Sequence, residues 1–129
     1  MALMTRQQAY RLPALKLAFV GDTVCDLLIR TELMFRDDPV RETHRSATQV
    51  VNARAQASQL DAVDHLLNTD ERDVVQRARN AHPAHSLPQA ASREEYMKAT
   101  AFKALMGYLY LSGQMRRAQT LFQLGRVKE

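Results

Sequence analysis

The stretch LAFVGDTVCDLLIR, residues 17–30, sets the helical periodicity on which the fold depends. Apolar residues recur through it at spacings of three and four, as they do on one face of an amphipathic helix. The pattern begins after Pro13, a residue that favours the start of a helix, and it continues to Leu33. It predicts a helix over residues 15–33.

The rest of the chain has few β-branched runs and shows the same helical periodicity, which predicts an all-α fold. Pro39 disfavours helical backbone just before it, so FRDDPVRET (35–43) is predicted to be a connection. Thr69 is a predicted N-cap, and Ser92 with Glu95 three residues later forms a capping-box pattern. The further helices are expected at about residues 45–67, 69–78, 92–112 and 115–124, the fourth helix stopping at Gly113.

The length of 129 residues predicts a single domain over residues 1–129, because it is long enough for one substantial core but short for two domains. No apolar run approaches the roughly 18 residues of a membrane span. The segment MALMTRQQAY at the start also lacks the apolar stretch of a signal peptide, so a cytoplasmic location and no membrane partner are expected. Eighteen basic and 14 acidic residues give a net charge of +4, which suits a polyanionic partner such as RNA.

The single cysteine, Cys25, excludes an intramolecular disulfide and a cysteine-rich zinc site. Because it lies in an apolar run, it is predicted to be a small core residue. His82 and His85 form an H-x-x-H pair, but Pro83 lies between them and no further ligand follows at suitable spacing. A zinc site is therefore not predicted there.

Two glycines, Gly21 and Gly107, lie inside predicted helices, where each costs about 1 kcal/mol relative to alanine. One interpretation is that they are unrelated, tolerated glycines. The other is that two helices cross closely at these positions, where a Cβ atom would hold the backbones apart. That crossing would bring Asp22 close to Lys103.

Asp22 and Asp26 are spaced i and i+4, so they share one face of the first helix and interrupt its apolar run. Most such acids are solvated surface residues. A carboxylate pair flanked by apolar residues also suits Mg²⁺, which needs only one or two carboxylates together with waters and phosphate oxygens. Both interpretations stay open from the spacing alone.

Four segments of the sequence resemble the catalytic domain of the ribonuclease III family. The segments are LAFVGDTVCDLLIR (17–30), VNARAQA (51–57), RARNAH (77–82) and ATAFKALMGYLYL (99–111). They occur in the family's order and at its spacing, and they cover nearly the whole chain. The similarity is greatest to the Mini-ribonuclease III group, the short bacterial form without a separate double-stranded-RNA-binding domain.

The resemblance implies an all-helical endonuclease that acts as a homodimer on double-stranded RNA, not DNA, and uses Mg²⁺. Its implied role is the maturation of large-subunit (23S) ribosomal RNA precursors. The family's essential carboxylates are an aspartate, matched here by Asp22, and a glutamate, whose position is occupied by Lys103. Larger members carry further acids at the positions of Leu15 and Ala18, which the Mini-ribonuclease III group also tends to lack.

Lysine in place of the glutamate removes an anionic ligand and adds a cation. At about 4 Å, two like charges repel by about 4 kcal/mol when the effective dielectric constant is about 20. Lys103 is expected to pair with Asp22 and to impair Mg²⁺-dependent cleavage severely. Two alternatives stay open. In one, the ammonium contacts the scissile phosphate while Asp22 and Asp26 hold a metal. In the other, Lys103 is either an introduced change that traps an RNA complex or a natural drift to a non-cleaving RNA-binding protein.

The resemblance makes the segment RARNAHPAH (77–85) the main candidate for contact with RNA phosphates. Residues on and before the second helix are secondary candidates, whereas Arg72, Arg116 and Arg117 are expected on solvent-facing sides. The RNA-binding candidates are Arg77, Arg79, Asn80, His82, His85, His44, Arg45 and Arg54. The alternative interpretation of residues 77–85 is a solvated loop without an RNA-binding role.

The apolar faces of the first and fourth helices are candidates for the dimer interface. Tyr96, Tyr108 and Tyr110 follow helical spacing among apolar residues, which favours core or interface positions over base stacking. Three hypotheses follow: a Mini-ribonuclease III-type endoribonuclease, a non-catalytic duplex-binding dimer on the same scaffold, or a basic helical interaction module without an RNA role.

Overall fold

The computed structural model describes residues 3–37, 39–81 and 92–126. Helices and their connections make up these ranges, which contain no strand, and the predicted all-α class is confirmed. The elements are α1 (Arg6–Tyr10), α2 (Ala14–Leu33), α3 (Val40–Val50), α4 (Ala53–Val63), the 3₁₀ helix η1 (Asp64–Leu66), α5 (Thr69–Asn80), α6 (Arg93–Leu111) and α7 (Met115–Arg126). Within the described ranges, no helix has both the length and the apolar character needed to cross a bilayer.

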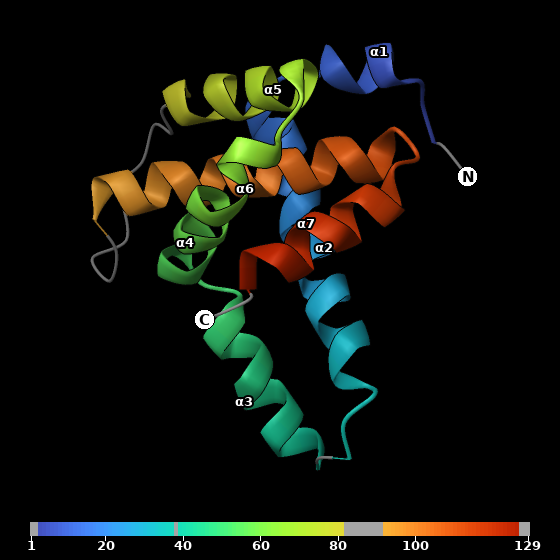
Figure 1. Cartoon of the computed structure of the whole chain (residues 1–129), viewed down its shortest axis with the longest axis vertical. Coiled ribbons are helices and arrows are strands. Elements are labelled where there is room, and N and C mark those ends of the chain that lie inside the picture. Colours follow the sequence, from blue (N-terminus) through green and yellow to red (C-terminus); the bar gives the residue numbers. More distant parts are fainter. Residues whose placement is uncertain (1–2, 38, 82–91, 127–129) are drawn as a thin grey trace.

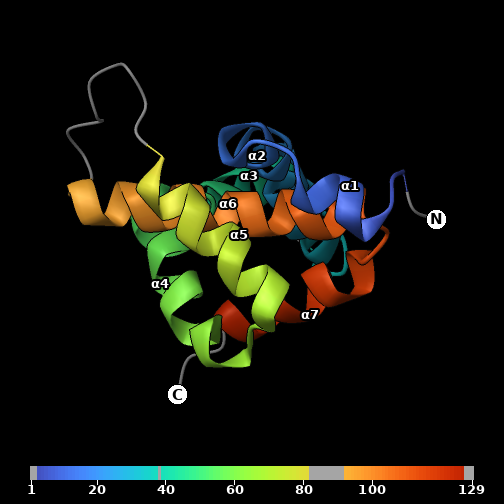
Figure 2. The same ribbon diagram turned by 90° about the horizontal axis from the view of Figure 1, so that it is seen from above.

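Helix α6 is the central element of the fold. Figure 2 shows it between α2 on one side and α4 and α7 on the other, with α5 crossing over it. Nine of its 19 residues are buried, including Ala101, Phe102 and Leu105. A helix that is apolar around most of its circumference must be covered on several sides, so its sequence accounts for its central place.

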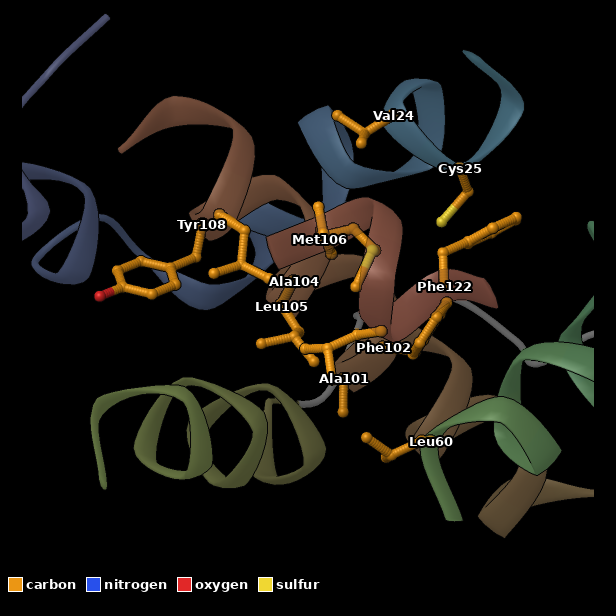
Figure 3. Packing of buried hydrophobic residues seen from close by; sticks show 14 of the residues in the cluster. Val24, Cys25, Leu60, Ala101, Phe102, Ala104, Leu105, Met106, Tyr108 and Phe122 are labelled. Atoms are coloured by element: carbon orange, nitrogen blue, oxygen red, sulfur yellow. The ribbon is translucent and has the colours of Figure 1, made fainter. Parts of the chain in front are cut away.

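The core joins α6 to its neighbours through large side chains. The rings of Phe102 on α6 and Phe122 on α7 stack with their centroids 6.3 Å apart. Leu60 from α4 and Cys25 from α2 close the same cluster from two other directions (Figure 3). The helix that carries Lys103 is therefore fixed by packing against α2, α4 and α7 together.

Both ends of α6 follow from local sequence. The Ser92 hydroxyl accepts a hydrogen bond from the Glu95 backbone N–H, and the Glu95 carboxylate accepts one from the Ser92 N–H. This is the predicted capping box, which satisfies backbone donors at the start of the helix. At the other end, Gly113 has a φ of 77°, a conformation that glycine adopts without the penalty of a Cβ atom.

The predicted helix over residues 45–67 is wrong, because the structure divides this range among α3, α4 and η1. The backbone leaves the helical conformation at Val51 and Asn52, and the Asn52 side chain caps α4 by accepting a hydrogen bond from the Ala55 N–H. The apolar stripe continues in the same helical period on both sides of the interruption, so the hydrophobic pattern does not show where one helix ends and the next begins. The connection after α2 is also shorter than predicted, because α3 begins at Val40.

Three smaller boundaries also differ from the sequence-based expectation. The N-cap of α5 is Asn68 rather than Thr69, and its capping box with Glu71 sets the start of the helix one residue earlier. Helices α5 and α7 each extend two residues further than predicted, to Asn80 and Arg126. The short helix α1 was not predicted; it begins at a capping box between Thr5 and Gln8.

A buried ion pair joins α5 to α7. The Arg117 guanidinium donates to both carboxylate oxygens of Glu71, at 3.0 and 2.9 Å, and to the backbone carbonyl of Leu66 at 2.8 Å. The Glu71 side chain is only 1% exposed. The hydrogen bonds to Glu71 raise the pKa of Arg117 above its ordinary value. Arg117 therefore does not simply lie on a solvent-facing side, as expected from the sequence, but supports the packing of α7.

Candidate functional site

Helices α2 and α6 cross in direct backbone contact at Gly21 and Gly107. A Cβ atom added at Gly21 would overlap the carbonyl oxygen of Lys103 and lie 3.0 Å from the backbone nitrogen of Gly107. A Cβ atom at Gly107 would in turn overlap the carbonyl oxygen of Leu17. Of the two interpretations of these glycines, the close crossing is confirmed, and it fixes the backbones that carry Asp22 and Lys103.

The crossing brings Lys103 and Asp22 together. The Nζ atom of Lys103 lies 3.3 Å from Oδ1 of Asp22, with side chains 30% and 59% exposed. The contact has the geometry of an ion pair that water reaches from one side. The expectation that these residues are adjacent is therefore confirmed, and the ammonium neutralises the carboxylate where the resemblance places a metal.

The residues around this pair do not fit a divalent cation. Within the described residues, no group of three or more histidine, cysteine, aspartate or glutamate side chains converges to hold a metal. Asp26 lies one turn beyond Asp22, while Leu15 and Ala18 supply no ligand atoms. Mg²⁺ prefers oxygen ligands, and a cation at 3.3 Å from the principal carboxylate opposes its binding.

Cys25 lies beneath this pair in the core. It is buried, as predicted, and burial raises the pKa of its thiol to about 12. The nearby charges of Lys103, Asp22 and Asp26 have smaller and opposing effects on that pKa. Because only a thiolate is an effective nucleophile or metal ligand, the thiol is inert at neutral pH.

Two of the predicted RNA-binding arginines meet at the first turn of α6. Arg54 Nε, at the start of α4, lies 3.4 Å from Oε2 of Glu95, and Arg79 Nη2, near the end of α5, lies 3.9 Å from Oε1 of Glu94. Figure 1 shows the end of α5 and the start of α6 on the same side of the molecule, with α4 below them. Asn80 is exposed at the last position of α5.

Arg77 has a different environment from the other arginines of its segment. Its guanidinium donates to Asp73 Oδ2 at 3.0 Å and to the carbonyls of Tyr10 and Leu12 at 2.6 and 3.3 Å, and it lies over the Tyr10 ring. The Tyr10 hydroxyl donates to Asp73 at 2.7 Å, which raises the pKa of Tyr10 and lowers that of Asp73. Arg77 thus ties the segment after α1 to α5.

The remaining RNA-binding candidates are dispersed. His44 is exposed on α3, as is Arg45, which forms an ion pair with Glu42 at 3.8 Å. His82 and His85 lie outside the described residues. The acidic partners Glu94 and Glu95 were not predicted to contact arginines; only the capping role of Glu95 is visible in the local sequence.

Of the exposed large apolar residues in the described ranges, five lie on α2 or directly after it and others lie on η1, α3 and α7, but none lies on α6. Phe19 is 81% exposed, and Leu15 and Leu27 on the same helix are 43% and 52% exposed. No large apolar side chain of α6 is exposed, and Tyr108 is buried in the core. The expectation of an exposed apolar face therefore holds for the first predicted helix and is wrong for the fourth.

Comparison with known proteins gives consistent matches. The model of the family described as "Ribonuclease III domain" matches residues 15–114. A Mini-ribonuclease 3 of Thermoanaerobacter sp. (strain X514) is 37% identical over 123 residues, covering 95% of this chain and 86% of that protein. A Mini-ribonuclease 3 of Symbiobacterium thermophilum is 42% identical over 113 residues, covering 87% of this chain and 86% of that protein.

The fold is also similar to a solved structure. The crystal structure of a Fusobacterium nucleatum protein superimposes with a TM-score of 0.80 at 24% identity, covering 88% of this chain and 90% of that one. This likeness concerns the fold alone. The family match over residues 15–114 and the relatives that are more than 30% identical over most of this chain show that the chain belongs to the ribonuclease III domain family, whose members are endoribonucleases.

Proposed function

We propose that this chain has the scaffold of a double-stranded-RNA endoribonuclease of the Mini-ribonuclease III type, with residues 1–129 acting as one domain. Its relatives named Mini-ribonuclease 3 and the match to the ribonuclease III domain support this proposal. The substrate class follows from the family, and a duplex in the precursor of 23S ribosomal RNA in the cytoplasm is the expected target.

In this chain, cleavage is severely reduced because Lys103 occupies the position of the catalytic glutamate. One observation carries this part of the proposal: Lys103 Nζ lies 3.3 Å from Asp22 Oδ1, so the principal carboxylate already has a cationic partner. The same observation favours a second candidate function, a duplex-binding protein that does not cleave. Both functions share the RNA contact surface and differ only in the chemistry at the α2–α6 crossing.

RNA binding is expected to survive the lysine. The ammonium adds positive charge to the face that carries Asp22, and phosphate contacts supply much of the affinity of proteins for nucleic acids. Arg54, Arg79 and Asn80, together with His44 and Arg45 on α3, are exposed or partly exposed candidates for those contacts. The internal hydrogen bonds of Arg77 favour a supporting role for that residue instead.

A homodimer through α2 is part of the proposal. Helix α2 exposes apolar surface at Leu15, Phe19 and Leu27. Because the proposal includes no membrane partner, a second copy of the chain is the expected cover for this surface. Contiguous exposed apolar surface commonly marks a site of protein association. The molecular mass of the protein in solution, measured by sedimentation equilibrium, tests this assembly.

Cleavage of a long RNA duplex in the presence of Mg²⁺, by the parent chain and by Lys103→Glu, tests the catalytic proposal. The parent is expected to bind the duplex with little or no cleavage, and the glutamate variant to cleave it. Lys103→Gln, which removes the cation without supplying a carboxylate, is the matched control and is expected to cleave far less than Lys103→Glu.

The outcomes separate the hypotheses. Equal cleavage by the parent and Lys103→Glu would show that residue 103 does not govern the chemistry. Binding without cleavage by every variant would favour the non-catalytic duplex-binding function. Absence of duplex binding at any salt concentration would reject both and leave a helical interaction module.

A further inference from the structure

Two solvent-accessible arginines, one on α4 and one on α5, form ion pairs with two neighbouring glutamates at the start of α6. Arg54 of α4 pairs with Glu95 at 3.4 Å, and Arg79 of α5 pairs with Glu94 at 3.9 Å. The Arg54 side chain is 77% exposed and that of Arg79 is 36% exposed. Both guanidiniums therefore remain accessible from solvent while a carboxylate occupies one side of each.

The two carboxylates are held in place by other contacts. The Oε1 atom of Glu95 accepts the Ser92 backbone N–H at 3.0 Å in the capping box, which leaves Oε2 directed to Arg54. The carboxylate of Glu94 also contacts Lys98 Nζ at 3.9 Å, and Lys98 in turn contacts Asp61 at 2.9 Å. The capping box thus fixes Glu95, whereas Glu94, whose side chain is 71% exposed, is held by two longer contacts at 3.9 Å.

In these contacts, the positive charges of the arginines and the lysine are balanced by negative charges at the start of α6 and on α4. Arg54, Arg79 and Lys98 supply three positive charges, and Asp61, Glu94 and Glu95 supply three negative charges. They surround or adjoin a cavity of about 220 Å³ between α4 and α6. The chain as a whole carries a net charge of +4, whereas these six side chains, which include two RNA-binding candidates, contribute no net charge.

We propose that Glu94 and Glu95 form an autoinhibitory contact in which their carboxylates occupy the places of RNA phosphates on Arg79 and Arg54. An RNA duplex must displace them before both guanidiniums can bind its backbone. Carboxylate and phosphate oxygens accept the same charge-assisted hydrogen bonds from arginine, so the two partners compete directly. The first turn of α6 then limits affinity for RNA. This inference rests on the proposed duplex binding and adds a regulatory element to it.

The proposal is tested by measuring the dissociation constant for an RNA duplex across a series of KCl concentrations. Glu94→Gln and Glu95→Gln are each expected to tighten binding about threefold at low salt, and the double variant about tenfold. The slope of log affinity against log salt concentration should steepen by up to about one for each arginine released. Glutamine preserves the side-chain size and can replace glutamate in a capping box, so α6 keeps its N-terminal cap.

Two controls separate this effect from a general change in charge. Asp64→Asn also removes one negative charge, from an exposed pair in which Asp64 contacts Arg72 at 3.3 Å, and it is expected to leave duplex affinity unchanged. In an Arg54→Gln background, Glu95→Gln is expected to have no effect, because its arginine partner is absent. Thermal unfolding of each variant verifies that the fold is retained.

The opposite result is equally informative. If the carboxylates orient the arginines for RNA rather than compete with it, neutralising Glu94 and Glu95 will weaken binding, and the proposal is overturned. Equal tightening by Asp64→Asn would also overturn it. When the parent binds duplex and the variants do not bind more tightly, only this inference fails; when neither the parent nor any variant binds, the proposed function fails with it.

Discussion

Two ion pairs on opposite sides of α6 have similar chemistry and different consequences. Lys103 and Asp22 make one contact at 3.3 Å, and their side chains are 30% and 59% exposed. Arg117 and Glu71 make two hydrogen bonds at 3.0 and 2.9 Å, and Glu71 is 1% exposed. The first pair lies at the surface of a helix crossing, whereas the second is built into the packing of α5 against α7.

The difference shows which charges the fold requires. A solvated pair contributes at most about 1 kcal/mol, because water replaces either partner when the other is removed. A buried charge that loses its partner costs about 3–5 kcal/mol, because water cannot replace the missing contacts. The fold therefore depends on Arg117 and Glu71, while residue 103 is free to vary with the chemistry of the site.

The largest expected effect comes from the backbone contact beneath the exposed pair. Gly21→Ala introduces a methyl group that overlaps the carbonyl oxygen of Lys103, so α2 and α6 must separate. We expect a loss of about 5 kcal/mol or more, enough to unfold most of the protein. Urea denaturation followed by circular dichroism measures it.

Gly125→Ala is the matched control for this change. An added Cβ atom there would lie 3.0 Å from the Gln59 Cβ atom and 3.1 Å from its carbonyl oxygen, contacts that a small shift relieves. We expect a loss below about 2 kcal/mol. A Gly21→Ala protein as stable as Gly125→Ala would contradict the close crossing of α2 and α6.

The next effect compares the two ion pairs directly. Arg117→Met leaves Glu71 buried without its cationic partner and is expected to lower the free energy of unfolding by about 3–5 kcal/mol. Lys103→Met leaves Asp22 exposed to water and is expected to change it by less than about 1 kcal/mol. Urea denaturation of both variants measures the difference. Similar losses for the two substitutions would show that exposure does not distinguish these pairs.

The smallest effect concerns the core beneath Lys103 and appears only at high pH. Burial raises the pKa of Cys25 from 9.0 to about 12, so the thiol stays protonated in the folded state while it ionises in the unfolded chain. The contribution of the protonated Cys25 thiol to the free energy of unfolding is therefore fully present below pH 9, and it is lost as the pH rises toward 12. From about pH 8 to about pH 10.5, we expect a loss of about 2 kcal/mol from this residue.

Cys25→Ala should remove that part of the pH dependence. The substitution lowers stability at every pH, so the informative quantity is the change in unfolding free energy between the two pH values. The variant should lose about 2 kcal/mol less than the parent over this interval. An unchanged alkaline loss would show that water reaches the thiol in the folded protein.

Local signals in the sequence predict much of this fold. The Ser92–Glu95 capping box, Gly113 and the helical run after Pro13 each depend on neighbouring residues, and the structure confirms them. The break at Asn52 was missed although asparagine is a favoured N-cap, because the apolar stripe on both sides follows one helical period.

In the candidate site, too, features that depend on the local sequence could be predicted, whereas contacts between distant parts of the chain could not. Gly21 and Gly107 suggest the crossing as one of two interpretations, because a glycine inside a helix is costly unless close packing requires it. The structure confirms that crossing, which places Asp22 beside Lys103. The partners of Arg77 and Arg117 could not be predicted, because Tyr10 and Glu71 lie 67 and 46 positions away in the chain. Such contacts depend on how helices pack, which periodicity does not specify.

The glycine contact at the α2–α6 crossing also bears on how this site can change over generations. Because the Lys103 backbone is fixed against Gly21, the side chain at position 103 begins from the same point whatever its identity. In the genetic code, each lysine codon becomes a glutamate codon by one change at its first base. A single nucleotide substitution therefore exchanges a cation for a carboxylate beside Asp22 without altering the packing of the helices. If Lys103 occupies the position of the family's glutamate, as proposed, the gene encoding this scaffold stands one mutational step from that carboxylate.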